Sequence, residues 1–311
     1  MSQEIVVGTR QSMLALWQAR WVVERLGSLY PGVRFPIKTI RTQGDKILDV
    51  ALAKIGDKGL FTKELEYAIL QGEVRMAVHS MKDLPTAIPS ELTLAAVCER
   101  EYPGDVLVCP SGLTLDKLPP GARVGTSSLR RAAQLLHYRP DLQIVSIRGN
   151  VNTRLSKIEE QRLDAVVLAY AGMARLGLAD RITERIPFEI CLPAVGQGSI
   201  GVEAKKSDEA LLSMLQAIDH EPTRAAITAE RAFLRRLEGG CQVPIAAYAA
   251  CEDGRVRLSG LVASLDGREM IRHSAEGLAA DAQRIGIALA ESMLEMGAGR
   301  LLRAASREAF K

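Results

Sequence analysis

Short apolar segments alternate with amphipathic segments through the first two thirds of this chain, and that alternation constrains the fold most. Ile5-Val6-Val7 is typical of a buried strand, and residues 12–30 carry apolar side chains at helical spacing, with Ser12 as the expected N-cap. Further strands are predicted at 35–40, 74–79, 92–97, 105–109, 122–125, 142–147 and 163–170, with helices after 122–125 and 142–147. The alternation predicts an α/β fold with mainly parallel sheets.

A short motif recurs within this α/β region. Val7-Gly8-Thr9 returns as Val124-Gly125-Thr126, and a hydroxyl residue and a helix are expected after each copy. The apolar strands at 74–80 and 165–170 form a second pair, because each ends near a polar or small turn. We interpret the repeat as two similar α/β domains that face one another. Chance recurrence is the alternative, since V-G-T is common at strand ends.

The last ninety or so residues have a different pattern. Asp253-Gly254 and Asp266-Gly267 separate strand-like runs and are strong hairpin signals. A long amphipathic helix is predicted at 280–296, ended by Gly297, and Pro222 is expected to open an earlier helix. This region is therefore predicted to be a small α+β domain with an antiparallel sheet.

Composition excludes several classes of protein. No apolar run in the 311 residues approaches the ~20 that a membrane span needs. Five cysteines without a C-x-x-C motif, and four scattered histidines, argue against a disulfide framework and a metal site. The first ten residues lack the features of a targeting segment, so we expect a cytoplasmic protein.

The basic residues are unevenly placed. The 40 basic and 37 acidic residues nearly cancel, but 29 of the basic residues are arginines, whose planar forks suit carboxylates and phosphates. Residues 123–154 hold six arginines and one acid. Arg130 and Arg131 follow Ser128 in the first turn of a predicted helix, whereas Arg148 and Arg154 follow the next strand. This placement at strand ends favours a site for an anionic ligand. The alternative is that the arginines only form a solvated basic surface.

Two kinds of anionic partner are disfavoured by the same region. Aromatic residues make up 4% of the chain and are not interleaved with the arginines, so stacking platforms for nucleic acid are missing. No G-x-x-x-x-G-K-[ST] motif is present to hold a nucleoside triphosphate. A polyanionic small molecule fits the arginines better.

Three further segments have both a chemical and a bland interpretation. His79-Ser80-Met81-Lys82-Asp83 follows a strand, where Asp83 is either in a surface ion pair or a proton-transferring carboxylate in a cleft. Residues 53–61 resemble a mobile lid that presents Lys54, Lys58 and an exposed Phe61, or are a solvent loop. Cys241 follows two glycines on a predicted loop. It is either an attachment point for another group or a small buried residue.

Taken in order, these motifs identify a family resemblance that covers essentially the whole chain. The sequence resembles hydroxymethylbilane synthases, also called porphobilinogen deaminases. The matching segments are Gly8-Thr9-Arg10-Gln11-Ser12, Lys58-Gly59-Leu60-Phe61, His79-Ser80-Met81-Lys82-Asp83, Gly125-Thr126-Ser127-Ser128-Leu129-Arg130-Arg131, Arg148-Gly149-Asn150-Val151, Leu192-Pro193-Ala194-Val195-Gly196-Gln197-Gly198 and Glu238-Gly239-Gly240-Cys241-Gln242-Val243-Pro244. Each motif alone is weak, but the ordered set is highly specific.

The resemblance implies a transferase of tetrapyrrole biosynthesis. Four porphobilinogen molecules would be joined head to tail with loss of ammonia, and water would release linear hydroxymethylbilane. The growth would be primed on a dipyrromethane cofactor held by a thioether to Cys241, with no metal. The resemblance also implies a cytoplasmic monomer that acts on a small molecule, without a nucleic-acid or membrane partner.

The fold implied by the resemblance has two periplasmic-binding-protein-like α/β domains facing a cleft and a C-terminal α+β domain. Domain 1 would be discontinuous, comprising residues 1–98 and 198–216. Domain 2, with the arginine-rich wall, would comprise residues 103–192. Domain 3, with the cofactor cysteine, would comprise residues 221–311.

The resemblance also assigns roles to individual residues. The cofactor would be held by Cys241, Lys82, Ser128, Arg130, Arg131 and Arg148. The substrate would be bound by Arg10, Ser12, Gln18, Arg148, Arg154 and Arg175. Asp83 would be catalytic, because a carboxylate stabilises the positive charge that develops on pyrrole nitrogens and can relay protons.

Two other functions compete with this one. A two-lobed solute-binding or sensor protein would bind a polyanion without chemistry, since fold does not dictate function. It would need neither Asp83 nor Cys241. A nucleic-acid-binding regulator would show steeply salt-dependent DNA affinity.

Overall fold

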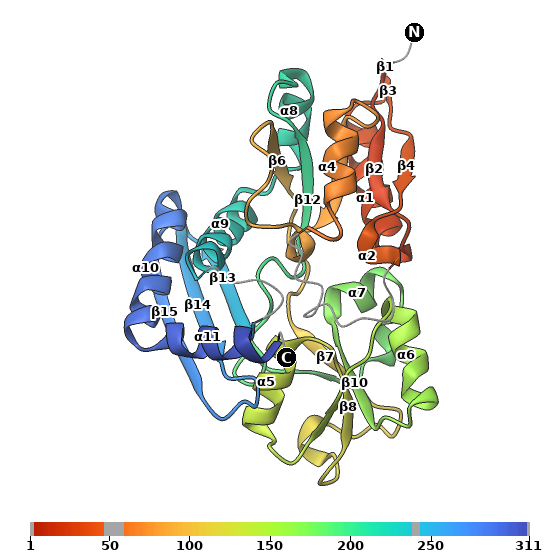
Figure 1. Ribbon diagram of the computed structural model, residues 1–311. Helices are drawn as coiled ribbons and strands as arrows, with labels where there is room; N and C mark the ends of the chain where they lie inside the picture. Colours follow the sequence, from red (N-terminus) through yellow and green to blue (C-terminus); the bar gives the residue numbers. More distant parts are fainter. Residues whose placement is uncertain (1–2, 47–58, 238–242, 310–311) are drawn as a thin grey trace. The chain divides into compact units, whose positions relative to one another are not determined.

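Within the described residues, the chain passes between two units of the fold three times, after residues 101, 197 and 224. The computed structural model describes residues 3–46, 59–237 and 243–309 (Figure 1). Unit 1 contains the described residues of 3–46, 59–101 and 198–224, and unit 2 contains those of 102–197 and 225–309. The chain therefore enters unit 2 after Glu101 and returns to unit 1 at Gly198.

Unit 1 is organised around a five-stranded sheet with one reversed strand. The order is β4 (Ile37–Ile40), β2 (Val7–Arg10), β5 (Met76–Ser80), β12 (Ile200–Lys205) and β6 (Leu92–Val97). The first three strands pair in parallel, whereas β12 is antiparallel to both of its neighbours. The carboxyl ends of β4, β2 and β5 consequently lie side by side at one edge of the sheet.

Helices cover both faces of this sheet. α1 (Met13–Leu29) and α8 (Glu209–Leu215) share one apolar core with the strands, and α4 (Lys63–Leu70) packs on the other face through Leu65 and Ile69. The predicted cap of α1 is confirmed, because Ser12 Oγ accepts a hydrogen bond from the Ala15 amide at 3.2 Å. A short helix, α2 (Gln43–Lys46), follows β4.

Unit 2 contains a second five-stranded sheet. Its order is β11 (Glu184–Arg185), β7 (Asp105–Val108), β10 (Ala165–Ala169), β8 (Arg123–Gly125) and β9 (Gln143–Val145). β10, β8 and β9 run in parallel, and β7 is antiparallel to β10 and β11. α5 (Leu129–Tyr138) follows β8, α6 (Val151–Glu160) follows β9 and α7 (Tyr170–Arg175) follows β10.

The two sheets share one plan, which confirms that the internal repeat is structural. β2 corresponds to β8, β5 to β10, and the reversed strand β12 to β7. The glycine of each V-G-T motif has a packing reason: an added Cβ would lie 3.0 Å from Val74 at Gly8 and 2.7 Å from Leu163 at Gly125. The prediction of mainly parallel sheets needs one correction, because each sheet has a reversed strand that the sequence pattern did not indicate.

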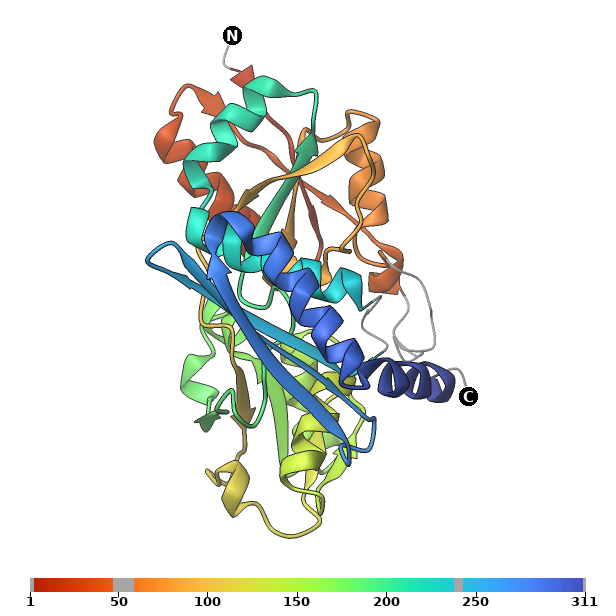
Figure 2. The same ribbon diagram turned by 90° about the vertical axis from the view of Figure 1, so that its left-hand side faces the viewer.

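The C-terminal region is the predicted α+β element and belongs to unit 2. β13 (Ile245–Glu252), β14 (Arg255–Ala263) and β15 (Met270–Leu278) form an antiparallel sheet. Both residues of the Asp253-Gly254 turn have positive φ, as a type I′ hairpin requires. α10 (Ala282–Glu295) lies across this sheet (Figure 2), and Phe233 and Leu289 are buried in the core between them.

Two helices complete this region. α9 (Glu221–Arg236) begins at the predicted place, whereas α11 (Ala298–Ala309) was not anticipated. Gly297, with φ of 101°, ends α10 as expected, but it separates two helices instead of closing the fold. The remaining short elements are β1 (Gln3–Glu4), β3 (Val33–Arg34), η1 (Met81–Asp83), η2 (Leu115–Lys117), η3 (Ala179–Arg181), η4 (Gln216–Ile218) and η5 (Ala279–Asp281). Among the described residues, no helix has both the length and the apolar character to span a membrane.

Candidate functional site

A polar cavity opens in unit 1 where β2 and β5 end. The cavity is lined by Arg10, Ser12, Leu14, Ala15, Gln18, Phe61, Val78, His79, Ser80 and Asp83. Parallel strands bring their carboxyl ends to one edge of a sheet, and ligands of α/β folds bind there. The structure thus brings together five residues that were singled out from the sequence, on β2, α1, η1 and the segment before α4.

Arg10, the last residue of β2, is shared by two carboxylates. Its Nη2 lies 2.5 Å from Asp45 Oδ1, and its Nη1 lies 3.7 Å from Asp83 Oδ2. Burial alone would raise the pKa of Asp45, but the hydrogen bond and charge of Arg10 outweigh it, so the pKa is lowered. Arg10 is therefore held firmly by Asp45 and only loosely by Asp83.

Phe61 closes one side of the cavity by stacking on Arg10. The guanidinium carbon lies 4.1 Å from the ring centroid, within the range of a cation–π contact. A Cβ at Gly44 would lie 2.1 Å from the ring, so a glycine at this position leaves room for the stack. The expectation of an exposed Phe61 is corrected accordingly, because the side chain is half-buried.

Gln18 and Ser80 both line the cavity and are hydrogen-bonded to each other. Gln18 Nε2 donates to Ser80 Oγ at 2.8 Å, and the Ser80 hydroxyl donates back to Gln18 Oε1 at 3.1 Å. Gln18 is buried in the middle of α1, so this pair ties the helix to the end of β5. It places the backbone that leads directly into Lys82 and Asp83.

Asp83 is the half-buried carboxylate of the cavity. η1 follows β5 immediately and carries Lys82 outward and Asp83 toward Arg10. The Asp83 side chain is 33% exposed, so solvent reaches it and a substrate can contact it. Of the two interpretations of Asp83, the structure favours a carboxylate in a cavity.

A buried ionisable cluster adjoins the cavity through the lining residue His79, and its grouping was not predicted from the sequence. His79 Nε2 lies 3.2 Å from Glu203 Oε2, although neither atom has a well-aligned hydrogen bond among the described residues. Glu66 reaches the same cluster from α4. Burial raises the pKa of Glu66, and the nearby charge of Glu203 adds to the effect. No local pattern signals this cluster, because its members are 13 or more residues apart.

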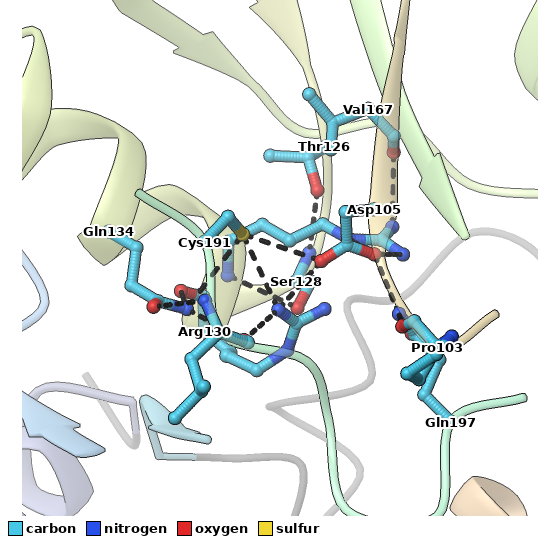
Figure 3. Close-up of polar contacts among 11 residues, drawn as sticks. Pro103, Asp105, Thr126, Ser128, Arg130, Gln134, Val167, Cys191 and Gln197 are labelled. Carbon is cyan, nitrogen blue, oxygen red and sulfur yellow. Dashed lines mark hydrogen bonds and ion pairs between the residues drawn. The ribbon is translucent and has the colours of Figure 1, made fainter. Parts of the chain in front are cut away.

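The arginine pair of unit 2 surrounds one internal carboxylate (Figure 3). Arg130 Nη1 lies 2.7 Å from Asp105 Oδ2, and Arg131 donates to Asp105 Oδ1 from Nε at 3.0 Å and from Nη2 at 2.7 Å. All three residues are buried, with Arg130 and Arg131 only 5% and 4% exposed. Burial alone would raise the pKa of Asp105, but the two guanidinium charges hold it well below its ordinary value.

Backbone carbonyls and one glutamine complete the arginine pair. Arg131 Nη1 donates to Val167 O at 3.0 Å, and Arg130 Nη1 donates to Leu192 O at 2.7 Å. Gln134 donates to Leu192 O at 3.1 Å and accepts from the Leu192 amide at 2.7 Å. This bonding explains why two basic residues tolerate the first turn of α5, where the helix dipole opposes them. Ser128 is the N-cap of α5, and its hydroxyl accepts from the Arg131 amide at 3.4 Å.

Cys191 is part of the same network but is not a reactive thiol. Its Sγ donates to Asp105 Oδ2 at 3.3 Å. Burial raises the pKa of the Cys191 thiol, and the Asp105 charge adds to the effect, giving a value of about 12. The thiol is therefore protonated and serves as a weak hydrogen-bond donor.

The other three arginines of the predicted site lie after neighbouring strands of unit 2. Arg148 follows β9, and burial lowers its pKa without discharging it. Arg154 lies in the first turn of α6 and donates from Nε to Gly149 O at 2.9 Å. Arg175 ends α7. All three are half-buried, and the strand order places β9, β8 and β10 side by side at one edge.

Three predicted residues lie outside the described part of the chain: Lys54 and Lys58 of the expected lid, and Cys241 of the expected cofactor loop. Among the described residues, no group of histidine, cysteine or acidic side chains is arranged to hold a metal ion.

Two residues of the arginine network were missed because their partners are distant in sequence. Asp105 begins β7 and was predicted only as a strand residue, and Gln197 was noted only within a glycine-rich segment. A buried strand that opens with an acid was the available signal for Asp105, since a fully buried carboxylate needs a cationic partner.

Comparison with protein families matches two models over most of the chain. Residues 5–213 match the model described as porphobilinogen deaminase, dipyromethane cofactor binding domain. Residues 224–295 match the porphobilinogen deaminase C-terminal domain. The second match covers the antiparallel sheet and α10.

Curated relatives are similar over the full length. The chain is 62% identical to a porphobilinogen deaminase of Pelotomaculum thermopropionicum over 308 residues, covering 99% of each chain. It is 57% identical to that of Carboxydothermus hydrogenoformans, again over 99% of each chain. Identity to the Synechococcus elongatus protein is 52%, over 97% of this chain and 95% of the relative.

Solved structures are only distantly similar. The VFT2 domain of Bordetella pertussis BvgS aligns with 70% of this chain and 85% of its own, at 20% identity and a TM-score of 0.42. A probable amino-acid transporter extracellular-binding protein of Bacillus subtilis aligns with 70% of this chain and 90% of its own, at 14% identity and a TM-score of 0.41.

Proposed function

Because this chain belongs to the porphobilinogen deaminase family, we propose that it is a hydroxymethylbilane synthase acting through the cavity of unit 1. The enzyme is a transferase that joins four porphobilinogen molecules head to tail, releases ammonia and yields linear hydroxymethylbilane for tetrapyrrole biosynthesis. The observation that carries the proposal is Asp83, a solvent-reachable carboxylate 3.7 Å from Arg10 in a cavity at the strand ends.

Asp83 supplies the charge that the reaction needs. Positive charge develops on the pyrrole nitrogen of porphobilinogen as ammonia leaves, and a nearby carboxylate stabilises it. The same carboxylate accepts a proton and returns it, which general acid–base catalysis requires. Arg10 sits beside Asp83 and presents its Nη1 group to a substrate carboxylate, while its Nε and Nη2 are bonded to Asp45. The firm bond to Asp45 keeps Arg10 from neutralising Asp83.

Ser12 and Gln18 position this machinery. Ser12 caps α1, and Gln18 holds Ser80 at the end of β5, so both fix the backbone on either side of the cavity. We assign both to the substrate site as polar groups of its wall. Phe61, stacked on Arg10, covers the cavity, and Lys54 and Lys58 belong to the same proposed lid.

The dipyrromethane cofactor fits the donors of unit 2. When bound, it supplies the primer to which substrate units are added. Each of its pyrroles carries two carboxylates, and the Arg130–Arg131–Asp105 cluster combines two buried positive charges with one negative charge. The uncompensated charge attracts a carboxylate. We assign Ser128, Arg130, Arg131, Arg148 and Lys82 to holding the cofactor, and Cys241 to its thioether.

Arg148, Arg154 and Arg175 are assigned to the substrate and the growing chain. They are half-buried cations after β9 and β10, and each added pyrrole brings further carboxylates. Burial lowers the pKa of Arg148, so an anion beside it recovers part of the lost solvation.

The domain organisation is part of the proposal. We infer three domains, at 1–98 with 198–216, at 103–192 and at 221–311. The third has an apolar core of its own around Phe233 and Leu289, distinct from the cores around the second sheet. Limited proteolysis that releases a stable fragment beginning near residue 221 would support it.

The assembly state and location are also proposed. The enzyme acts as a cytoplasmic monomer on a small molecule, with no nucleic-acid or membrane partner. The near balance of charge and the low aromatic content support the lack of a nucleic-acid partner. Light scattering of the purified enzyme, and DNA titration at low salt, test these two points.

One experiment tests the function most directly. The intact mass of the chain, purified from cells that make porphobilinogen, should exceed the sequence mass by two linked pyrrole units. Cys241→Ala should remove the excess and the activity, whereas Cys251→Ala should keep both. A wild-type chain with unmodified mass and no turnover of porphobilinogen would instead support a polyanion-binding protein without chemistry.

A further inference from the structure

Within the described residues the chain crosses between units at three places, after residues 101, 197 and 224, and the first two crossings are bonded to each other. The outgoing crossing lies at residues 101–102 and the returning one at 197–198. Within unit 1, the Glu101 amide donates to Gly198 O at 3.2 Å. Within unit 2, Gln197 Nε2 donates to Pro103 O at 2.6 Å. The segments around residues 101–103 and 197–198 are therefore joined by two hydrogen bonds. The backbone bond lies in unit 1 and the side-chain bond lies in unit 2.

The side-chain bond also reaches the arginine pair. The Nε2 atom of Gln197 that donates to Pro103 O donates a second bond to Asp105 Oδ1 at 2.9 Å (Figure 3). An amide nitrogen has two hydrogens, so Gln197 uses both of them. Asp105 Oδ1 is the same oxygen that accepts from Arg131 Nε and Nη2. Asp105 Oδ1 thus accepts hydrogen bonds from both the Arg131 guanidinium group and the Gln197 amide, and the same amide is bonded to Pro103 at the first crossing.

This sharing links the strength of the two bonds. Gln197 is 2% exposed and Asp105 is fully buried, so water does not replace a lost partner. Hydrogen bonds in a low-dielectric interior influence one another. When one donor moves away from a carboxylate oxygen, the hydrogen bonds from the remaining donors to that oxygen become stronger. An anion that draws the guanidinium groups of Arg130 and Arg131 toward itself therefore strengthens the bond from Gln197 to Asp105.

We propose that Gln197 is a positioning residue that couples anion binding at Arg130 and Arg131 to the stability of the two crossings. The proposal rests on the proposed function only for the identity of the anion, a carboxylate of the pyrrole chain. Coupling between sites is reciprocal, so a well-held crossing also favours anion binding. The Asp105 carboxylate connects the two, because it accepts hydrogen bonds from Gln197 and from the arginines.

Gln134 provides a matched control. It is also a glutamine, is 1% exposed and makes hydrogen bonds to Leu192 and to the Arg130 carbonyl in the same network. The bonds described for its side chain involve neither Asp105 nor Pro103. A general loss of packing in this region affects both glutamine variants, whereas the proposed coupling affects only Gln197.

Hydrogen exchange of the full-length holoenzyme tests the coupling. The reporter amides are Glu101, bonded to Gly198 O, and Tyr170, bonded to Gly104 O beside Pro103. In Gln197→Leu, exchange at both should rise roughly three- to tenfold, the effect expected for one lost buried hydrogen bond. In Gln134→Leu, exchange should rise near Leu192 and leave both reporters within a factor of two. Equal rises in the two variants, or no rise in Gln197→Leu, would overturn the proposal.

Ligand dependence provides the second measurement. Because Arg130 and Arg131 are assigned to the bound cofactor, exchange at both reporters should be slower in the wild-type holoenzyme than in Cys241→Ala, which lacks the cofactor. This slowing should be lost when Gln197→Leu is introduced and kept with Gln134→Leu. Slowing that persists in Gln197→Leu would contradict the coupling. If Gln197→Leu does not fold, Gln197→Asn keeps the amide but shortens its reach and undergoes the same comparison. The intact mass reports on the proposed function separately, and the exchange difference without substrate does not depend on it.

Discussion

The two sheets share one plan but use their acidic residues in opposite ways. The reversed strand of each sheet begins opposite the last residue of the neighbouring parallel strand: Asp105 pairs with Ala169 in unit 2, and Ile200 pairs with Ser80 in unit 1. Unit 2 thus has a carboxylate where unit 1 has an apolar side chain. In unit 1 the carboxylate, Asp83, comes three residues after β5 and faces a cavity.

This difference separates a rigid site from an adjustable one. In unit 2 the internal carboxylate satisfies two arginines in a water-excluded network, which fixes their positions before any ligand arrives. In unit 1 Arg10 divides its donors between Asp45 and Asp83 and remains near solvent. Preorganised donors suit a group that stays bound, whereas shared donors suit a substrate that must enter repeatedly.

The largest expected effect breaks the chemistry of unit 1. Asp83→Asn should lower the turnover of porphobilinogen by about a thousandfold or more, because the charge that stabilises the pyrrole cation is lost. Asp83→Glu should retain more activity, since it keeps the charge. Steady-state kinetics measure both, with thermal melting as the check on folding. Near-normal turnover in Asp83→Asn would remove Asp83 from the mechanism.

The next effect breaks the network of unit 2. Asp105→Asn should destabilise the fold by about 3–5 kcal/mol, because two buried guanidinium groups lose their counter-charge. Asp45→Asn, which removes the half-buried carboxylate that holds Arg10 in unit 1, should cost about 1 kcal/mol or less. Urea denaturation at neutral pH compares the two variants. Similar losses for both would mean that the two arginine sites do not differ in rigidity.

The pH dependence sharpens this second prediction. The pKa of Asp105 is lowered in the fold, so its contribution is complete above the ordinary value of 3.8 and is lost as the pH falls below it. The stability gap between wild type and Asp105→Asn should therefore be constant from about pH 7 to pH 5 and should narrow below about pH 4. A gap that narrows already between pH 7 and pH 5 would point to another titrating group.

A smaller change in stability, this time an increase, is expected when Glu66 is replaced. The pKa of Glu66 is raised, so its ionised form costs stability at neutral pH. Glu66→Gln should raise stability by roughly 1 kcal/mol at pH 7, and the gain should vanish as the pH approaches the ordinary value near 4.5. Thermal melting across this range measures it, with Glu24→Gln on the exposed face of α1 as the control. A gain that does not depend on pH would contradict the charge explanation.

The smallest expected effect concerns the stack on Arg10. Phe61→Leu should cost about 0.5–1 kcal/mol, because the cation–π contact is lost while an apolar side chain remains. Phe61→Tyr should be close to wild type, since it keeps the ring. A loss of several kcal/mol in Phe61→Leu would show that Arg10 is held as rigidly as Arg130 and Arg131.

Much of the local structure was predictable from short-range patterns. Helix caps at Ser12 and Ser128, the Asp253-Gly254 turn and the strands that precede each V-G-T motif depend on neighbours within a few residues. The reversed strands were not predictable in this way. β7 was predicted as a strand without a direction, and β12 was not predicted at all. The direction of a strand depends on where the chain re-enters the sheet.

The residues of the candidate site likewise fall into those that local sequence motifs predicted and those that they did not. Order and spacing of motifs were enough to propose Asp83, Arg10, Arg130 and Arg131, and the family comparisons support the chemistry to which they belong. Partners distant in sequence were not predictable: Asp105 for the arginine pair, Asp45 for Arg10 and Gln197 for the crossings.

The sequence by itself determined which side chains this protein has for gripping carboxylates and stabilising a cation, and at which strand ends they lie. Only the tertiary structure decided which internal acid each arginine bonds, Asp105 for Arg130 and Arg131 and Asp45 for Arg10, and how deeply each pair is buried. The physical reason is burial. A charge far from water must find a counter-charge, and the fold alone determines which distant residue provides it.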